Sequence, residues 1–235
     1  MIRFLDGGLL RQIQAIFTCY LGSLLTGFSV AFSAIAIPGI KLDRAQQLSF
    51  VGSIEVSDAN LSWFGKFFSN FPGDVLISCL PASTVAVGMM IGCLLGGILG
   101  GKYGPKKTIQ MSSLFGITGW SLMIFSSKFY LLISGRIIVG VGCAFTTANA
   151  SLLVAQYSNQ KQRGTFLSLY ALMIGFGILL CYSLGAVLHW RYVACAPPAI
   201  YIFLAFSLCF VPESPIWLLT HKGETLASEA LKWLR

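Results

Sequence analysis

Six long apolar runs, separated by short polar segments, dominate the chain. A helix needs roughly 20 residues to cross a bilayer, and each run is about that long. Helices are expected rather than open strands, because an isolated strand leaves its backbone N–H and C=O groups without partners in hydrocarbon. The pattern therefore predicts an all-α, polytopic membrane protein with six transmembrane helices, near residues 13–37, 82–101, 109–127, 129–155, 165–188 and 192–211.

The composition agrees with a chain whose solvent is largely lipid. Of the 235 residues, 56% are hydrophobic and only 10% are charged, and the mean hydropathy is +0.78. Soluble domains carry about a quarter charged residues, and this much apolar surface cannot be hidden in one water-soluble core. The net charge is +8, and the basic residues occur in short clusters between the apolar runs, which is typical of a membrane protein. We therefore expect a lipid bilayer, and no nucleic acid, as a partner.

The distribution of Lys and Arg predicts the orientation of the helices. If the N-terminus is inside, the inner segments carry about twice as many Lys and Arg residues as the outer segments. Both termini are therefore expected in the cytoplasm. The long outer loop, at about residues 38–81, contains a sequon for N-glycosylation at Asn60.

Patterns that carry catalysis or bind metals are absent from the sequence. Seven cysteines fall mostly inside the apolar runs, and the two histidines, His189 and His221, stand far apart. This arrangement gives neither a nucleophile–base pair nor a metal-ligand set, and it argues against a disulfide framework. The string GGILGGKY approaches a phosphate-binding loop, but Tyr103 stands where that loop needs Ser or Thr. We expect no enzyme activity, no catalytic residue, no metal and no cofactor.

One permanent charge lies inside an apolar run. Arg136, in the string GRIIVGVG, stands within residues 129–155, and no acidic residue is near it in the sequence. An unpaired guanidinium in hydrocarbon is costly, so the side chain must face the bundle interior or reach outward to the interface. The sequence leaves these two alternatives, and the partner of Arg136, open.

Glycines recur every four residues in the run 82–101. This spacing puts them on one helix face, where a second backbone can approach closely. The expected role is helix packing, either in a static pair or between helices that slide, for Gly88, Gly92, Gly96 and Gly100.

The order of several motifs resembles the sugar-porter branch of the major facilitator superfamily. GGKYGPKKT resembles the loop motif that follows the second span, SGRIIVGVG the fourth span, QRGTF the inner Arg-Gly after it, and VPESPIWLL the signature after the sixth span. LGSLLTGF and IGFGILLCY look closest to the trehalose-transporter-like group. The residues that carry the resemblance, and that it places in an inner gate and conformational motif, are Gly97, Lys102, Gly104, Lys106, Lys107, Gly135, Arg136, Arg163, Gly164 and Glu213.

The resemblance implies a carrier with two halves of six spans each. Residues 1–211 would form the N-terminal six-helix bundle, and residues 212–235 the start of the cytoplasmic linker helices. The implied function is facilitative uptake of a hexose, or of a disaccharide such as trehalose, by alternating access at the plasma membrane. The expected partners are a small-molecule sugar and either the missing C-terminal half or a second copy.

Four positions depart from the family pattern. The acid of the loop motif is replaced by Gly101, the acid at the end of the fourth span by Gln156, and the arginine of the last signature by Ile216. A glutamine that contacts sugar in many relatives falls at Ala171. These losses predict a rebalanced inner gate and leave the substrate specificity open.

Two further irregularities concern the chain as a whole. It stops after six spans, which favours a fragment or a truncated gene model. Residues 66–78, KFFSNFPGDVLIS, intervene where relatives pass almost directly into the second span, and their composition fits neither a helix nor a compact turn well. A retained short intron and a loop insertion are the two alternatives.

Polar and aromatic residues of the first and fourth spans are the candidates for substrate contact. Hydroxyls and amides hydrogen-bond to sugars, and an aromatic ring stacks on them. In membrane helices Ser and Thr more often bond to their own backbone or to a neighbouring helix, and this alternative stays open. The candidates are Ser23, Thr26, Phe28, Ser29, Thr146 and Asn149.

Two other functions remain as alternatives to sugar transport. An organic-ion carrier of the same superfamily is disfavoured, because the predicted spans contain no acidic residue to bind a cation. A non-transporting sensor or assembly partner is favoured by the lost gate charges and by the missing half.

Overall fold

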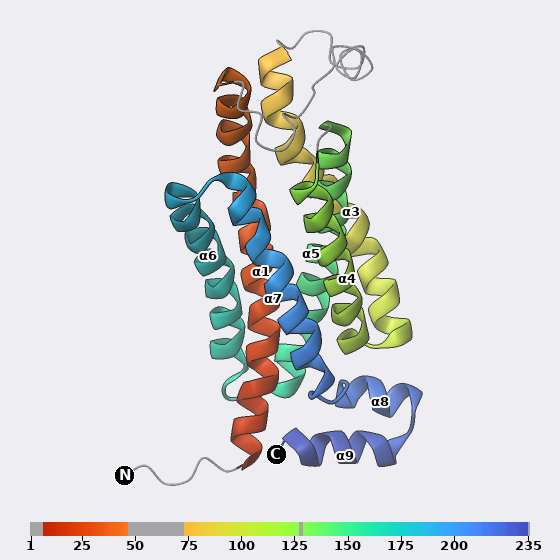
Figure 1. The fold of residues 1–235 in the computed structure, drawn as a ribbon. Helices are drawn as coiled ribbons and strands as arrows, with labels where there is room; N and C mark the ends of the chain where they lie inside the picture. Colours follow the sequence, from red (N-terminus) through yellow and green to blue (C-terminus); the bar gives the residue numbers. More distant parts are fainter. Residues whose placement is uncertain (1–6, 47–72, 127–128, 235) are drawn as a thin grey trace, which may run out of the picture.

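The computed structural model describes residues 7–46, 73–126 and 129–234, and all their regular elements are helices (Figure 1). Six are long and two are short. In chain order they are α1 (Gly7–Gln46), α3 (Gly73–Tyr103), α4 (Pro105–Ile124), α5 (Phe129–Tyr157), α6 (Arg163–Val187), α7 (Trp190–Cys209), α8 (Pro215–His221) and α9 (Glu224–Leu234).

Each predicted span corresponds to one long helix, so the predicted all-α bundle is confirmed. Five of the described helices are long and apolar enough to cross a membrane by length and composition alone. The sixth, α4, is less apolar because its first turns contain Lys106, Lys107 and Gln110. It packs between α5 and α7.

The helices next to the long outer loop are longer than the sequence predicts. Residues 38–46 continue α1 and residues 73–81 begin α3, so the expected loop limits of 38 and 81 are wrong. Residues 73–78, thought to fit a helix poorly, are helical. The sequon at Asn60 and residues 66–72 lie outside the described residues.

The bundle is built from two similar helix pairs that cross at glycines. In one pair α1 packs on α6, and a Cβ added at Gly27 or Gly177 would lie 3.1 Å from the Cα of the residue it faces. In the other pair α5 packs on α3, where a Cβ at Gly88 would lie 3.1 Å from the Cα of Gly140. The third helices also correspond, since α7 packs on α1 as α4 packs on α5. This is the contact pattern of an internal three-helix repeat.

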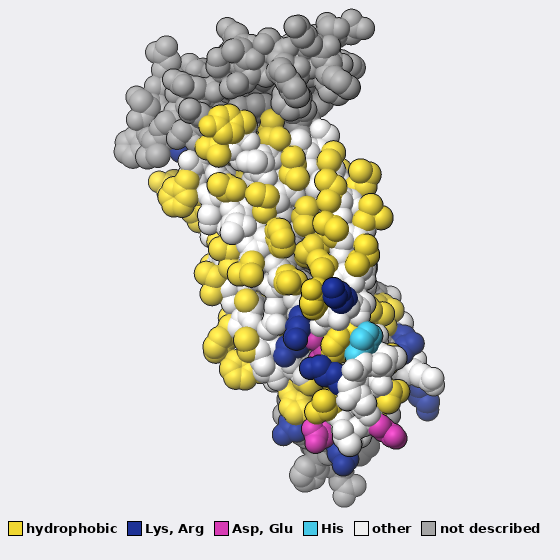
Figure 2. All heavy atoms as spheres, turned by 90° about the vertical axis from the view of Figure 1, so that its right-hand side faces the viewer, with side chains coloured by type: hydrophobic (Ala, Val, Ile, Leu, Met, Phe, Trp, Pro, Cys, Tyr) yellow, Lys and Arg dark blue, Asp and Glu magenta, His cyan; other side chains and the backbone are white. Residues whose placement is uncertain are grey.

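The central and peripheral helices differ in how much of them is covered. In the most apolar stretches of α1 and α5, 61% of the residues are buried, against 28% in α3 and 17% in α6. Figure 2 shows the apolar side chains as a broad band, with Lys and Arg gathered at its lower end. At that end α8 and α9 lie across the bundle, and α9 contacts α1 (Figure 1).

Candidate gate and substrate wall

Glu213 caps a helix through Lys106, a residue 107 positions away in sequence. Its Oε1 accepts hydrogen bonds from the backbone N–H of Lys106, at 2.9 Å, and of Ser214, at 3.2 Å. Lys106 is the second residue of α4, and the N-cap residue of that helix, Gly104, has no side chain to supply a cap. The first N–H groups of a helix lack partners within the helix, and a carboxylate there is also favoured by the helix dipole. Glu213 therefore stabilises the start of α4.

Gly104 is required at this contact for two reasons. Its φ is +99°, a conformation that L side chains rarely adopt. A Cβ at this position would also lie 2.7 Å from Oε2 and 2.8 Å from the Cδ of Glu213. The glycine of the loop motif and the glutamate of the last signature are thus parts of one contact.

Three further hydrogen bonds fix the segment that follows α7. The hydroxyl of Tyr157 donates to the carbonyl of Pro212 at 2.7 Å, and that of Ser214 donates to Oε1 of Gln156 at 2.5 Å. The indole Nε1 of Trp217 donates to the carbonyl of Gly101, the third residue from the end of α3, at 2.8 Å. These bonds and the Glu213 cap join the ends of α3, α4 and α5, and we call this set of contacts the helix-end clamp.

Helix α1 joins the same clamp through Gln12. Its Nε2 donates to the backbone carbonyl of Tyr157 at 2.6 Å, and the side chain is buried. Gln12 and Tyr157 were not identified from the sequence as gate residues, and Gln156 was noted only as the replacement of an acid at the end of the fourth span. An amide side chain near the end of a predicted span does not indicate its partner.

The charged groups of Lys102 and Arg163 lie outside the clamp. The ammonium of Lys102 lies 5.4 Å from the ring centroid of Tyr103, and Arg163 is the exposed first residue of α6. Neither side chain reaches Glu213 in the contacts of the described residues. Lys107 is exposed, and burial lowers the pKa of Lys106, with Glu213 opposing that effect. Gly97 and Gly164 are exposed with open space beside them.

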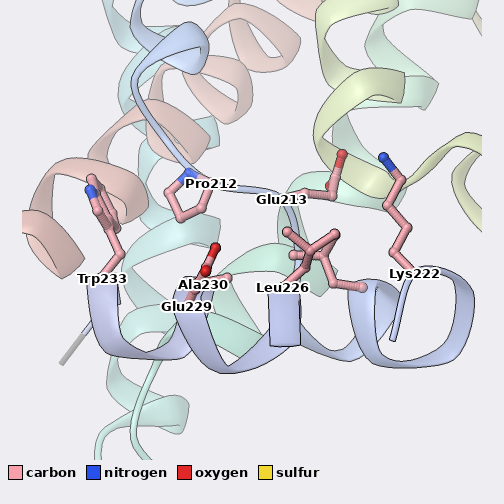
Figure 3. A pocket seen from close by; sticks show the side chains of 8 residues that line it. Pro212, Glu213, Lys222, Leu226, Glu229, Ala230 and Trp233 are labelled. Carbon is pink, nitrogen blue, oxygen red and sulfur yellow. The ribbon is translucent and has the colours of Figure 1, made fainter. Parts of the chain in front are cut away.

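A pocket of about 360 Å³ lies between the clamp and α9 (Figure 3). Its wall combines apolar side chains with two carboxylates and one ammonium. The guanidinium of Arg11 lies 5.8 Å from the indole centroid of Trp233, which ties α9 to α1. The residues that line the pocket are Pro212, Glu213, Leu218, Lys222, Leu226, Glu229, Ala230 and Trp233.

Arg136 faces the interior of the bundle, which settles the alternative that the sequence left open. Its side chain is 1% exposed, Nη1 donates to the backbone carbonyl of Ser29 at 3.2 Å, and the guanidinium lies 4.8 Å from the ring centroid of Phe32. Phe32 packs in turn on Trp120 of α4, with ring centroids 4.9 Å apart. Gly135, the residue before Arg136, lets α4 approach α5 closely, because a Cβ there would lie 2.8 Å from the carbonyl oxygen of Gly119. The guanidinium thus ties α5 to α1 without a carboxylate.

The four glycines of α3 lie against α5. A Cβ at Gly92 would lie 2.8 Å from the Cα of Val141, and one at Gly96 would lie 3.1 Å from the ring of Phe145. Gly88 faces the carbonyl of Ile137, and Gly100 faces the amide of Asn149. The two backbones are therefore held in direct contact along one face.

The six candidates for substrate contact are all buried in helix contacts in this conformation. On α1 the hydroxyls of Ser23, Thr26 and Ser29 donate to carbonyls one turn earlier in the same helix. These bonds match the alternative interpretation that Ser and Thr satisfy their own backbone. The remaining three pack between helices: Phe28 on Trp120, Thr146 on the hydroxyl of Ser112, and Asn149 on the carbonyl of Gly96. A role of any of them in binding substrate stays a prediction.

A protein-family model described as "Sugar (and other) transporter" matches residues 15–235. The chain is 29% identical over 227 residues to the mouse protein "Solute carrier family 2, facilitated glucose transporter member 8", and the match covers 95% of this chain and 42% of that protein. It is 28% identical over 224 residues to the "Facilitated trehalose transporter Tret1" of Anopheles gambiae, covering 95% of this chain and 25% of the other. The chain thus spans less than half the length of these relatives.

Solved structures show the same fold. The proton:xylose symporter XylE bound to 6-bromo-6-deoxy-D-glucose superposes with a TM-score of 0.78 at 18% identity, over 97% of this chain and 50% of the other. A partially occluded, inward-open form of XylE from E. coli gives 0.72 at 20% identity, over 94% and 55%. The six helices therefore have the arrangement of one half of such a protein.

Proposed function

The chain belongs to the sugar transporter family, and from this premise we propose that it forms one half of a facilitative sugar carrier. The proposed substrate is a hexose or a disaccharide such as trehalose, because the similar proteins are named as transporters of glucose and of trehalose. Such a carrier opens alternately to the two sides of the membrane by rocking one helix bundle against another. The second bundle would be supplied by further chain or by a second copy.

The observation that carries the proposal is the helix-end clamp. Alternating access needs a closure that is firm in one state and released in the other. Here the ends of α3, α4 and α5 are held by one segment, through the carboxylate of Glu213 and three hydrogen bonds. Each such bond contributes about 0.5–1.5 kcal/mol, so the set is strong enough to favour one state and weak enough to open.

Facilitative transport is favoured over proton coupling by the distribution of acids. None of the five apolar spans in the described residues contains Asp or Glu. The charge buried among them, Arg136, is held by a backbone carbonyl and an aromatic ring. Proton coupling uses a carboxylate or histidine in the membrane that gains and loses a proton. We propose that the carrier lies in the plasma membrane with both termini in the cytoplasm.

Uptake by the longest natural product containing this chain tests the proposal. The protein would be expressed in yeast that lacks its own hexose carriers and supplied with labelled glucose, trehalose or an organic cation. We expect saturable sugar uptake that equilibrates but does not concentrate the sugar, and that a protonophore leaves unchanged. Uptake of only the organic cation, or accumulation abolished by the protonophore, would contradict it.

A non-transporting sugar sensor is the second candidate. It is favoured by the two positions of the clamp that lack the acidic residues of the family. Gln156 and Gly101 stand where family members carry acids, and both act in the clamp through neutral hydrogen bonds. Saturable binding of sugar to the purified protein, without flux in proteoliposomes, would select this function over transport.

A further inference from the structure

Helix α8 has an apolar face that the described residues leave largely uncovered. Ile216 is 56% exposed and Leu219 is 55% exposed. They are three residues apart, so they lie on the same side of the helix. The opposite side is buried, because Leu218 packs with Ala227 and Ala230 of α9. Ile216 also stands where the family signature carries an arginine, so this face is more apolar than in the family pattern.

Helix α8 lies at the edge of the apolar band of the bundle. The indole Nε1 of Trp217 bonds to the carbonyl of Gly101, which fixes α8 at the end of α3. Figure 2 views the molecule from the side on which α3 and α8 lie in Figure 1, and the apolar band there ends at a group of Lys and Arg side chains. Tyr103, the last residue of α3, is 42% exposed. Tyrosine is enriched where hydrocarbon meets lipid headgroups, so α8 lies at the level that headgroups would occupy.

The charges around α8 divide into a basic and an acidic side. Lys102 at the end of α3 and Lys107 in the first turn of α4 are exposed. The exposed carboxylates at this end of the described residues belong to α9, at Glu224 and Glu229. In Figure 1 α9 lies beyond α8, on the side away from α3. An anionic surface that reaches α8 from the side of the bundle therefore meets lysines before it meets acids.

We propose that α8 rests on the inner leaflet of the bilayer and binds anionic phospholipids there. Ile216 and Leu219 would insert at the boundary of headgroups and acyl chains, and Lys102 and Lys107 would contact lipid phosphates. An apolar helix face flanked by lysines is the pattern with which proteins bind anionic membrane surfaces. A lysine stem lies along apolar surface while its ammonium reaches a polar partner. The choice of the inner leaflet rests on the proposed orientation of the chain, whereas the contact with lipid does not depend on transport.

Contact with lipid would act on the helix-end clamp. Glu213 and Trp217 make two of the contacts in the clamp, and they lie just before α8 and within it. A helix held at the membrane surface keeps both side chains against the ends of α3 and α4. Anionic lipid would therefore stabilise the closed clamp.

Hydrogen exchange in nanodiscs tests the proposal. The longest natural product containing this chain would be placed in phosphatidylcholine, with or without phosphatidylserine, and exchange of residues 213–222 would be measured. We expect phosphatidylserine to slow exchange about fivefold or more, the factor that one lysine contributes at an anionic surface. High salt should remove this effect by screening. The double variant Lys102→Gln, Lys107→Gln should lose the response to phosphatidylserine, and Ile216→Gln, Leu219→Gln should exchange faster than wild type in both lipids.

Two controls separate lipid contact from folding. Leu231→Gln changes a side chain that is 41% exposed on α9, and residues 213–222 should exchange in this variant as they do in wild type. In detergent without lipid, Ile216→Gln, Leu219→Gln should keep the melting temperature of wild type. A fall there would show that further chain or a second copy covers the face, and would overturn the proposal. Equal exchange of wild type with and without phosphatidylserine would also overturn it.

Discussion

The carboxylate of Glu213 and the backbone N–H of Lys106 lie 2.9 Å apart, although 107 residues separate them in the chain. This contact closes the N-terminus of α4 with a group from the far side of α7. It makes the start of one helix depend on the position of the segment 212–217. A movement of that segment away from the bundle would therefore expose the first N–H groups of α4. The contact thus holds the segment that leads into α8 and α9 against the bundle.

The first prediction concerns this cap. Glu213→Ala should lower the free energy of unfolding by about 1–2 kcal/mol, because capping groups are worth that much. Glu213→Gln keeps an acceptor oxygen but removes the charge, so it should lower the free energy of unfolding by less than Glu213→Ala does. Thermal unfolding of the purified protein in detergent measures both.

Glu229→Ala is the control for the cap, because Glu229 lines the same pocket whereas Glu213 makes the hydrogen bond to α4. Equal effects of Glu213→Ala and Glu229→Ala would show that general charge, rather than the cap, is what matters.

The second prediction compares two glycines with nearly the same backbone. Gly104 has φ +99° and Gly223 has φ +98°. Alanine at either position is strained by about 1–2 kcal/mol. At Gly104 the new Cβ also meets the carboxylate of Glu213 at 2.7 Å, whereas at Gly223 it meets nothing within 4 Å. Gly104→Ala should therefore destabilise the protein clearly more than Gly223→Ala, measured by thermal unfolding.

Combining Gly104→Ala with Glu213→Ala shows where the extra cost arises. The excess should largely disappear in the double variant, because the group that the Cβ strikes is gone. An excess that persists would place the cost elsewhere in the turn.

The third prediction uses two glycines on different faces of α3. A Cβ at Gly92 would lie 2.8 Å from the Cα of Val141, while one at Gly97 would have open space. Gly92→Ala must push α3 and α5 apart, at a cost of about 1–3 kcal/mol. Gly97→Ala should be neutral or stabilising, because alanine favours the helix by about 0.5–1 kcal/mol. Folded yield and melting temperature should separate the two variants, and equal behaviour would argue against close contact between the helices.

The sequence predicts where the helices lie better than it predicts where they end or which distant residues they contact. The six helices follow from apolar runs of the right length, because hydrocarbon permits little else. The extension of α1 to Gln46 and the early start of α3 at Gly73 could not be predicted, since polar flanks are compatible with both helix and loop.

The resemblance names residues of an inner gate, but it does not give their contacts. Gly104 and Glu213 were selected by resemblance, yet nothing local shows that one must lack a Cβ because the other approaches. The resemblance places Lys102, Arg163 and Glu213 in one inner network, whereas the partners of Glu213 in the described residues are the backbone N–H groups of Lys106 and Ser214. Backbone groups occur at every residue, so no sequence pattern singles them out.

The last prediction concerns Arg136. Its guanidinium contacts the carbonyl of Ser29 at 3.2 Å and the ring of Phe32 at 4.8 Å, and its Nε has no hydrogen-bond partner among the described residues. A buried charge without a carboxylate is held at a large desolvation cost, so an apolar side chain of similar length should fold at least as well. We expect Arg136→Met to keep or raise the melting temperature and to lower sugar uptake at least tenfold, because the link from α5 to α1 is lost. Arg136→Lys keeps the charge but is shorter and lacks the planar group that stacks on Phe32, so its uptake should also fall. Uptake by Arg136→Met equal to that of wild type would show that the arginine is dispensable for transport, and a strongly reduced melting temperature would show that it is held for stability.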